Sequence, residues 1–250
     1  LPASAWESWI FPTRVAGYQP TMLDELTTSG EVSIVGAGKA GARDPWIMLL
    51  PSDYAAELAP IVDVTLTPTQ QAVVDLLARG GGFYFPELLS DVGGGLVVPG
   101  TMQATELQDT LWELVEMGMV TPDGFGPIRA RLAAGTSGKS AHRAKRRPVR
   151  GRLRRGRTSF GPARSNPTPP DMLGRWSLAV TPATDATHRS IAHGEAWLEC
   201  YGVVTRGSVV AEDTIGGFAL AYKVLAGFEE SGKATRGYLI DALGAAQFST

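Results

Sequence analysis

One arrangement of apolar and polar positions occurs three times along the chain. An apolar residue is followed three positions later by Leu or Phe, four positions further on by Gly, and two positions after that by Val or Ala. The copies are Leu23-Leu26-Gly30-Val32, Leu111-Leu114-Gly118-Val120 and Leu225-Phe228-Gly232-Ala234. This spacing predicts two residues on one helix face, a left-handed glycine that ends the helix, and an extended segment directly after it. A helix that runs straight into a hairpin is typical of the third helix of a winged helix.

The segments that follow the three glycines predict different wings. After the first glycine, residues 31–50 predict a hairpin with a long glycine-rich tip at residues 36–41. After the third glycine, residues 233–240 predict the start of another hairpin. The middle copy is followed by Pro-Asp-Gly and by a helical pattern over residues 127–132, so we expect its wing to be reduced or missing.

Helix starts are predicted upstream of the middle and third copies of the repeated pattern. Capping-box patterns begin at Thr67 and Thr105. Thr205 is expected to cap a short helix that runs to Glu212, and the glycine pair at 216–217 is expected to form the next turn. Together these elements predict an α+β fold made of tandem winged-helix (helix–turn–helix) modules.

Positive charge is concentrated in one segment. Residues 136–170 hold eleven of the 23 Lys and Arg residues and no Asp or Glu, although the whole chain has a net charge of −2. The segment has almost no apolar residues and cannot offset the entropy of ordering, so it is predicted to be a flexible, disordered linker. The expected domains are a partial winged helix truncated at its start (1–60), a second, mostly helical winged-helix-like module (61–135), the basic linker (136–172) and a third winged helix (173–250).

The cations of this linker are the best candidates for contacts with DNA phosphates, together with one lysine on the last long helix and two cations on the last wing. These residues are Lys139, Arg143, Lys145, Arg146, Arg147, Arg150, Arg152, Arg154, Arg155, Arg157, Lys223, Lys233 and Arg236. The alternative interpretation is that they are solvated surface charges. The rest of the chain has twelve basic and 25 acidic residues, which argues against a large surface that reads a DNA groove.

The sequence contains no complete catalytic centre. Residues 133–140 approach the pattern of a phosphate-binding loop, but such a loop needs a strand before it and a helix after it, and neither is predicted here. The three histidines and the single cysteine lack the spacing of metal ligands. A glycosylase needs a carboxylate poised beside a flipped base, and nothing in the sequence singles out Asp213 or Asp241 for that role. We therefore predict no catalytic residue, no metal site and no cofactor in this chain.

The compartment is also suggested by composition. No apolar run approaches the roughly 20 residues that a membrane span needs, and the first residues do not form a signal peptide. A single cysteine fits a reducing compartment. Combined with DNA as a partner, these features predict a cytoplasmic, nucleoid-associated protein.

Several blocks of sequence resemble the C-terminal region of bacterial large helicase-related (Lhr) proteins. They occur in that family's order and cover nearly the whole chain outside the linker. The blocks are Phe11-Pro12-Thr13-Arg14-Val15 through Tyr18, Leu23-Asp24-Glu25-Leu26, Gly30-Glu31-Val32, Leu111-Trp112-Glu113-Leu114-Val115 with Gly118 and Val120-Thr121, Gly174-Arg175-Trp176-Ser177-Leu178, Tyr201-Gly202-Val203-Val204-Thr205-Arg206, and Gly237-Tyr238 with Leu243-Gly244-Ala245-Ala246-Gln247-Phe248.

The resemblance implies an origin in superfamily 2 DNA helicases and translocases that act in DNA repair, whose motor domains use ATP and Mg²⁺ outside this region. The family's C-terminal extension contains tandem winged helices and a β-barrel-like part, is associated with self-assembly, and in some relatives is linked to uracil-DNA glycosylase activity. We therefore expect a non-motor DNA-binding and assembly region, with single-stranded or duplex DNA and further copies of the chain as partners. A pure oligomerisation scaffold and part of a uracil-DNA glycosylase module remain as alternatives.

Overall fold

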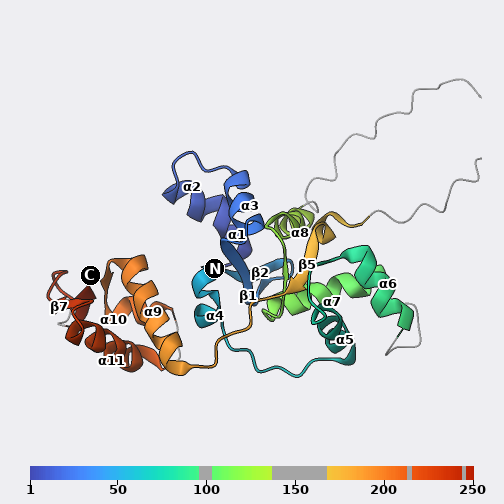
Figure 1. The fold of residues 1–250 in the computed structure, drawn as a ribbon. Coiled ribbons are helices and arrows are strands. Elements are labelled where there is room, and N and C mark those ends of the chain that lie inside the picture. Colours follow the sequence, from blue (N-terminus) through green and yellow to red (C-terminus); the bar gives the residue numbers. More distant parts are fainter. Residues whose placement is uncertain (96–102, 137–167, 213–215, 244–245) are drawn as a thin grey trace, which may run out of the picture. The chain divides into compact units, whose positions relative to one another are not determined.

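The computed structural model of the chain (Figure 1) describes residues 1–95, 103–136, 168–212, 216–243 and 246–250. The chain divides into two compact units. Unit 1 contains Leu1–Leu49 and Val62–Ala179, and unit 2 contains Leu50–Ile61 and Val180–Thr250. The predicted flexibility of the basic linker falls on residues that lie mostly outside the described part of the chain.

Unit 1 contains a complete winged helix between residues 68 and 178. Its elements in chain order are α5 (Pro68–Leu77), β3 (Phe83–Tyr84), α6 (Phe85–Gly95), α7 (Ala104–Glu116), β4 (Val120–Pro122), α8 (Gly126–Thr136), the 3-10 helix η4 (Pro170–Met172) and β5 (Arg175–Leu178). The strands form an antiparallel sheet in the order β3-β5-β4. Trp176 of β5 pairs with Phe83 on one side and with Pro122 on the other, so β5 is the central strand.

Strand β5 corrects the prediction for the middle hairpin. The wing of this module was expected to be reduced or missing because the sequence after β4 is helical. Instead, β4 pairs with β5, which begins only at Arg175, beyond the basic linker. Helix α8 and residues 137–167 therefore connect the two strands of the hairpin, in the position of the wing. Residues 173–179 accordingly belong to unit 1, whereas the sequence placed them in the third winged helix.

Residues 1–51 supply the remaining winged-helix elements, which belong to unit 1 except for the last two residues of β2. These are α1 (Ala3–Ala5), the π-helical turn η1 (Trp6–Ile10), α2 (Phe11–Arg14), α3 (Pro20–Thr28), β1 (Val32–Gly41) and β2 (Asp44–Pro51). Pro2 forms an isolated antiparallel bridge with Trp46 of β2, in the position of the first strand of a winged helix. Because β1 continues to Gly41, the glycine-rich stretch predicted as a long tip is part of a strand.

The two modules of unit 1 share one hydrophobic core. Leu23 and Ile47 of the first module belong to the same buried cluster as Trp112 and Trp176 of the middle module. The rings of Trp112 and Trp176 meet edge to face with their centroids 5.5 Å apart, and both are fully buried. The first module is therefore part of a larger folded unit, whereas the sequence had suggested a separate domain ending near residue 60.

Unit 2 contains a second complete winged helix with the same order of elements as the middle module. Its elements are α9 (Ala186–Tyr201), β6 (Val203–Val204), α10 (Arg206–Ala211), α11 (Gly217–Glu230), β7 (Thr235–Gly237) and β8 (Gln247–Ser249). The strand order β6-β8-β7 also matches that of the middle module. Residues 50–61 add η2 (Ser52–Tyr54) and α4 (Ala55–Leu58) to this unit. Arg189 of α9 fixes α4 by donating hydrogen bonds to the carbonyl oxygens of Ala56 and Ala59.

The repeated glycine has the predicted conformation in all three copies. Gly30, Gly118 and Gly232 have φ angles of +80°, +74° and +75°, and each lies between a helix and the strand that follows it. An L-residue would be strained at such an angle, so the glycine is required for the abrupt change of direction. One member of the pattern departs from the expectation. Leu26 is 38% exposed rather than packed on the inner face of α3.

Two of the three predicted helix caps are confirmed. Thr67 and Thr205 each form a capping box with the residue three positions later. The third prediction is wrong, because α7 begins at Ala104 and Thr105 lies within its first turn. The glycine pair predicted as a turn is confirmed in part, since Gly216 is the left-handed N-cap of α11 and Gly217 is its first residue.

Candidate nucleic-acid interface

In each winged helix, the helix that leads into the hairpin has the position from which helix–turn–helix proteins enter the major groove. We call α3, α7 and α11 the recognition-position helices. Helix α3 carries Asp24 and Glu25 and no Lys or Arg, and α7 carries four acidic residues and no Lys or Arg. Helix α11 carries Lys223 together with Glu229 and Glu230. Because DNA binding depends on neutralising phosphates with cations, these helices are poorly suited to reading a groove.

Lys233 and Arg236, predicted as phosphate contacts on the last wing, already have acidic partners within unit 2. The Lys233 Nζ lies 3.0 Å from a carboxylate oxygen of Glu195. The Arg236 Nε lies 3.3 Å from a carboxylate oxygen of Glu229, and the same guanidinium donates to the hydroxyl of Tyr222. Both pairs are exposed to solvent, so they are weak and a phosphate can replace the carboxylate at small cost.

Lys223, the third predicted contact in unit 2, lies on the exposed side of α11. It forms no ion pair with any other residue in the described part of the chain. It lines a groove between α9 and α11 whose other walls are mostly apolar. Its ammonium group is therefore available to an anionic partner.

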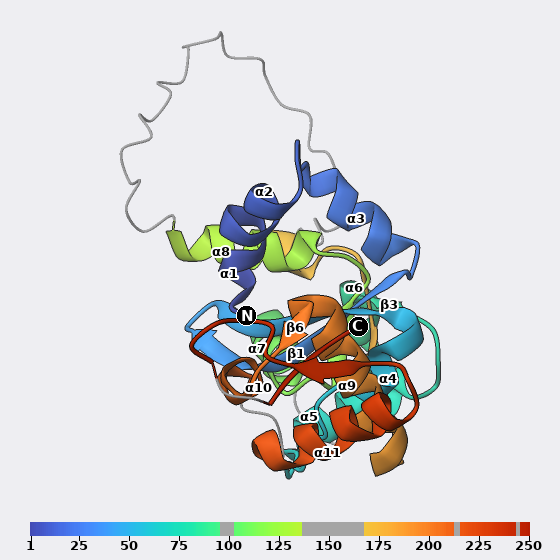
Figure 2. The ribbon, with the colours of Figure 1, turned by 90° about the vertical axis from the view of Figure 1, so that its left-hand side faces the viewer.

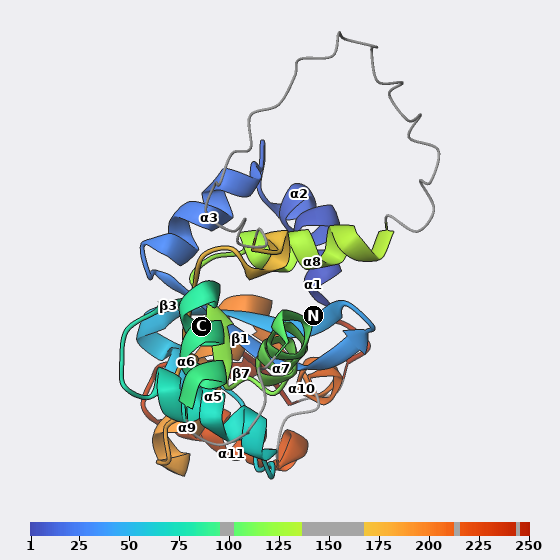
Figure 3. The same cartoon turned by 90° about the vertical axis from the view of Figure 1, so that its right-hand side faces the viewer.

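The other ten predicted contacts, between Lys139 and Arg157, lie outside the described residues. The structure does define where this stretch of chain leaves and rejoins the fold. It leaves at the end of α8 and returns at η4, and these two elements pack against each other (Figure 1 and Figure 3). Eleven cations are thus inserted at one place in unit 1, in the wing of the middle module.

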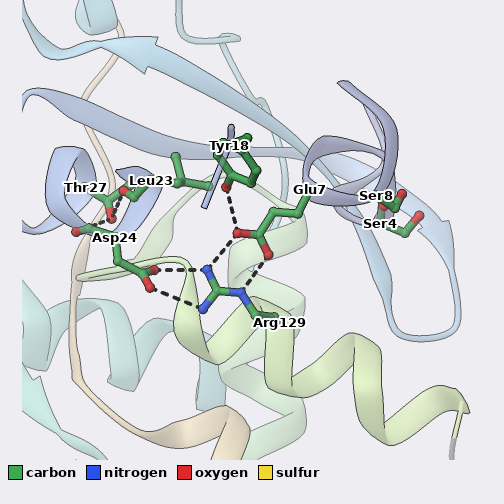
Figure 4. A network of polar contacts seen from close by, with 8 residues as sticks. All are labelled: Ser4, Glu7, Ser8, Tyr18, Leu23, Asp24, Thr27 and Arg129. Carbon is green, nitrogen blue, oxygen red and sulfur yellow. Dashed lines mark hydrogen bonds and ion pairs between the residues drawn. The ribbon is translucent and has the colours of Figure 1, made fainter. Parts of the chain in front are cut away.

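The start of the insertion is fixed by Arg129 of α8 (Figure 4). The Arg129 guanidinium donates to both carboxylate oxygens of Glu7, at 2.6 and 2.8 Å, and to those of Asp24, at 3.1 and 3.4 Å. The hydroxyl of Tyr18 donates to Glu7 at 2.9 Å. Hydrogen bonding to Glu7 raises the pKa of Arg129, and burial together with Glu7 raises the pKa of Tyr18. Figure 2 shows α8 beside α1 and α2. The cluster ties α8 to η1 through Glu7 and to α3 through Asp24, so Arg129 is not free to contact DNA.

The end of the insertion is fixed by a buried carboxylate, Asp171 of η4. It accepts hydrogen bonds of 2.8 Å from Gln108 and of 3.2 Å from the indole of Trp112. The guanidinium of Arg131 lies 4.5 Å from the centre of a Trp112 ring and 4.0 Å from both Asp171 and Glu116. Burial lowers the pKa of Arg131 and raises that of Glu116. This second cluster therefore joins α7 and α8 to η4, the element at which the chain rejoins the fold after the insertion.

Sequence reasoning missed both clusters. Arg129 and Arg131 stand just before the basic linker and look like its first cations. The only available signal was their spacing of two residues within a helical pattern, which places them on different faces of α8.

The described residues contain no cluster of potential metal ligands. No group of three or more His, Cys, Asp or Glu residues among them is arranged to hold a metal ion. Ser208 serves the capping box of α10, and Asp185 accepts hydrogen bonds from two backbone amides at the start of α9. Asp241 is exposed, whereas Asp213 lies outside the described residues. Within the described chain, no helix combines the length and apolar character needed to cross a membrane.

Family models for the winged-helix domains of large helicase-related proteins match both ends of the chain. Residues 1–52 match the model for the third such domain, and residues 183–250 match the model for the fourth. The chain carries winged-helix domains of the large helicase-related (Lhr) family. The resemblance seen in the sequence blocks is thereby confirmed, and the middle winged helix lies in the chain between the two matched Lhr domains.

Two Lhr proteins are similar along the full length of the chain. One, from Mycolicibacterium smegmatis, is named Lhr helicase/probable uracil glycosylase and is 40% identical over 258 residues. The other, from Escherichia coli, is named Lhr helicase/uracil glycosylase and is 35% identical over 257 residues. Both comparisons cover the whole chain, but the chain spans only 16% of the length of each relative.

Proposed function

We propose that this chain is a non-motor region of an Lhr-type helicase that binds DNA and supports assembly in DNA repair. Its DNA contacts come mainly from the basic segment between Lys139 and Arg164. The observation that carries the proposal is the separation of charge. The cations are inserted in the wing of the middle module, whereas the recognition-position helices carry more acidic than basic residues.

The two ends of the insertion support this role. Arg129 ties α8 to the first module, and Asp171 ties η4 to α7, so the segment starts and ends on a rigid base. A cationic segment tethered at both ends keeps its charges within a short distance of unit 1, which raises their effective concentration near bound DNA. Phosphate contacts of this kind give affinity without sequence preference.

The experiment that tests the proposal is binding of labelled single-stranded and duplex DNA by the chain with and without residues 139–164. We expect the deletion to lose most of the affinity for both DNA forms at low salt. A circular dichroism spectrum and thermal unfolding curve like those of the unaltered chain would show that the winged helices remain folded. Equal affinity of the two proteins would refute the role of the segment in DNA binding.

Assembly is the second part of the proposal, and the acidic recognition-position helices favour it. Helix α7 is packed into the core of unit 1, but α3 exposes Met22 and Leu26 and α11 exposes Leu220, and these apolar side chains can contact other protein surfaces, including other copies of the chain. Analytical ultracentrifugation of the chain, with the variant that lacks residues 139–164 as control, measures this directly. Self-association that persists without the basic segment, together with no DNA binding by either protein, would favour a pure oligomerisation scaffold.

A share in uracil-DNA glycosylase activity is the remaining alternative, and it is supported by the names of both relatives. Release of uracil from a labelled oligonucleotide by this chain, lost in the Asp241→Asn variant, would support this alternative.

The proposed role in DNA binding also implies a location in the cytoplasm, at the nucleoid, where the DNA partner lies.

A further inference from the structure

Unit 2 has an open groove of about 620 Å³ between α9 and α11. Its apolar lining includes Ile191 of α9 and Leu220, Val224 and Phe228 of α11. The two helices are in direct contact at Gly194, where an added Cβ would lie 2.8 Å from Val224 and 2.9 Å from Phe228. This close approach at a glycine makes Val224 and Phe228 part of the packed helix pair, so the groove is a fixed feature of the fold.

The groove includes the exposed side of α11, where Leu220, Lys223 and Gly227 are open to solvent. Leu220 and Ile191 are each 37% exposed there, although both are large apolar residues. Gly227 also lines the groove, and no atom lies within 4 Å of a Cβ added to it. An exposed apolar groove of this kind favours burial of another apolar surface over contact with phosphates.

The charges at the groove favour an acidic partner. Lys223 and Lys233 are the charged side chains among the described residues that line it. Lys233 is held by Glu195, whereas Lys223 forms no ion pair within the described chain. A carboxylate beside an apolar surface would therefore meet one free ammonium group on docking.

We propose that the α9–α11 groove of unit 2 docks an amphipathic helix of a partner protein, which presents aliphatic side chains flanked by carboxylates. The aliphatic residues of the partner helix cover Ile191, Leu220 and Val224, and one carboxylate of the partner helix pairs with Lys223. This is the helix-in-groove mode of peptide recognition, in which anchors recur at three- and four-residue spacing. The proposal gives unit 2 a protein-binding role that is independent of the DNA-binding role proposed for the basic segment.

Gly227→Gln is the most direct test variant. The position is in the interior of α11 and open to the groove, so the new side chain obstructs the groove without a clash inside the fold. Gly207→Gln on α10 is the matched control, because an added Cβ there meets only an ordinary contact of 3.6 Å. Lys223→Glu tests the charge by reversing it at one exposed position.

The probe is a labelled synthetic helix of about 18 residues, or five turns, with leucines along one face and glutamates beside them. A second peptide has lysine in place of each glutamate. Binding to the full chain is measured by fluorescence anisotropy, and amide chemical shifts locate the contact. We expect the acidic peptide to shift α9 and α11 signals and to bind about tenfold more tightly than the basic one.

The variants decide between docking and its alternatives. Gly227→Gln and Lys223→Glu are expected to lose most of the binding, whereas Gly207→Gln keeps it. Equal binding of the two peptides, or shifts outside α9 and α11, would overturn the proposal. It would also be overturned if duplex DNA, or a second copy of the chain at higher concentration, shifted the groove signals while the acidic peptide did not.

Discussion

Gly36 of β1 lies directly against the backbone of Val115 in α7. A Cβ added to Gly36 would be 1.6 Å from the carbonyl oxygen of Val115 and 3.1 Å from the backbone nitrogen of Gly118. Gly118 is also close from the other side, since its added Cβ would be 2.6 Å from the carbonyl oxygen of Gly36. Two glycines therefore allow the wing of the first module to meet the last turn of α7, and the contact explains why both modules share one core.

Gly36→Ala is expected to destabilise unit 1 by about 3 kcal/mol or more, because backbone atoms cannot move aside as a flexible side chain can. Urea unfolding followed by circular dichroism measures the loss. Gly126→Ala is the matched control, since no atom lies within 4 Å of a Cβ added at Gly126. A free energy of unfolding that is equal in the two variants would contradict the close contact.

Arg129→Ala is expected to cost roughly 2 kcal/mol, because it leaves the carboxylates of Glu7 and Asp24 close together without their shared cation. Arg129→Lys should recover little of this loss, since lysine cannot form the paired contacts with Glu7. Arg175→Ala removes an exposed 3.5 Å pair with Asp123 and is expected to change stability by less than about 0.5 kcal/mol. Thermal unfolding of all three variants provides the comparison, and full recovery by lysine would show that only the charge at this position matters.

Glu116 predicts a dependence of stability on pH. Burial raises its pKa in the folded state above the ordinary value of 4.5. The folded state therefore favours the protonated form, so this contribution is fully present below pH 4.5 and is lost as the pH rises through the folded-state pKa. We expect Glu116→Gln, which mimics the protonated form, to be more stable than the unaltered chain at pH 7, with the difference closing toward pH 4.5. Urea unfolding of both proteins across this range checks the sign, and a less stable variant at pH 7 would contradict it.

Gln247 organises the tip of the last wing. Its buried side chain accepts hydrogen bonds from the amides of Leu239 and Ile240, at 2.9 and 2.7 Å, and donates to the carbonyl oxygens of Ile240 and Leu243. Gln247→Ala is expected to increase hydrogen exchange at the amides of Leu239 and Ile240 by about fivefold, because each lost bond contributes roughly 1 kcal/mol. The amides of α11 serve as the internal control. Unchanged exchange at the two wing amides would show that other contacts hold the tip.

The sequence predicted those parts of the fold that local chemistry determines. The left-handed glycine at positions 30, 118 and 232 depends only on its own backbone angle, and the capping boxes at Thr67 and Thr205 involve residues three apart. The recognition of Lhr winged helices followed from these local blocks in their order along the chain.

Long-range pairings could not be predicted in the same way. Strand β5 has four residues and pairs with β4 across the whole basic linker, so no local pattern marks the two as partners. Arg129 is separated by more than a hundred residues from Glu7 and Asp24. The sequence alone therefore suggested a reduced wing where the fold has a completed hairpin, and no local pattern indicated the acidic partners of Arg129.

The measurement that tests the central claim most directly is the salt dependence of DNA affinity in two charge variants. One replaces the ten Lys and Arg residues between Lys139 and Arg157 by Gln, and the other replaces Lys223, Lys233 and Arg236 by Gln. Each phosphate contact contributes about 0.9 to the slope of log affinity against log salt on duplex DNA. We expect the first variant to lose most of the slope and the second to lose little of it. A slope that survives in the first variant and disappears in the second would contradict the account, because the winged helix of unit 2 would then be the principal DNA contact.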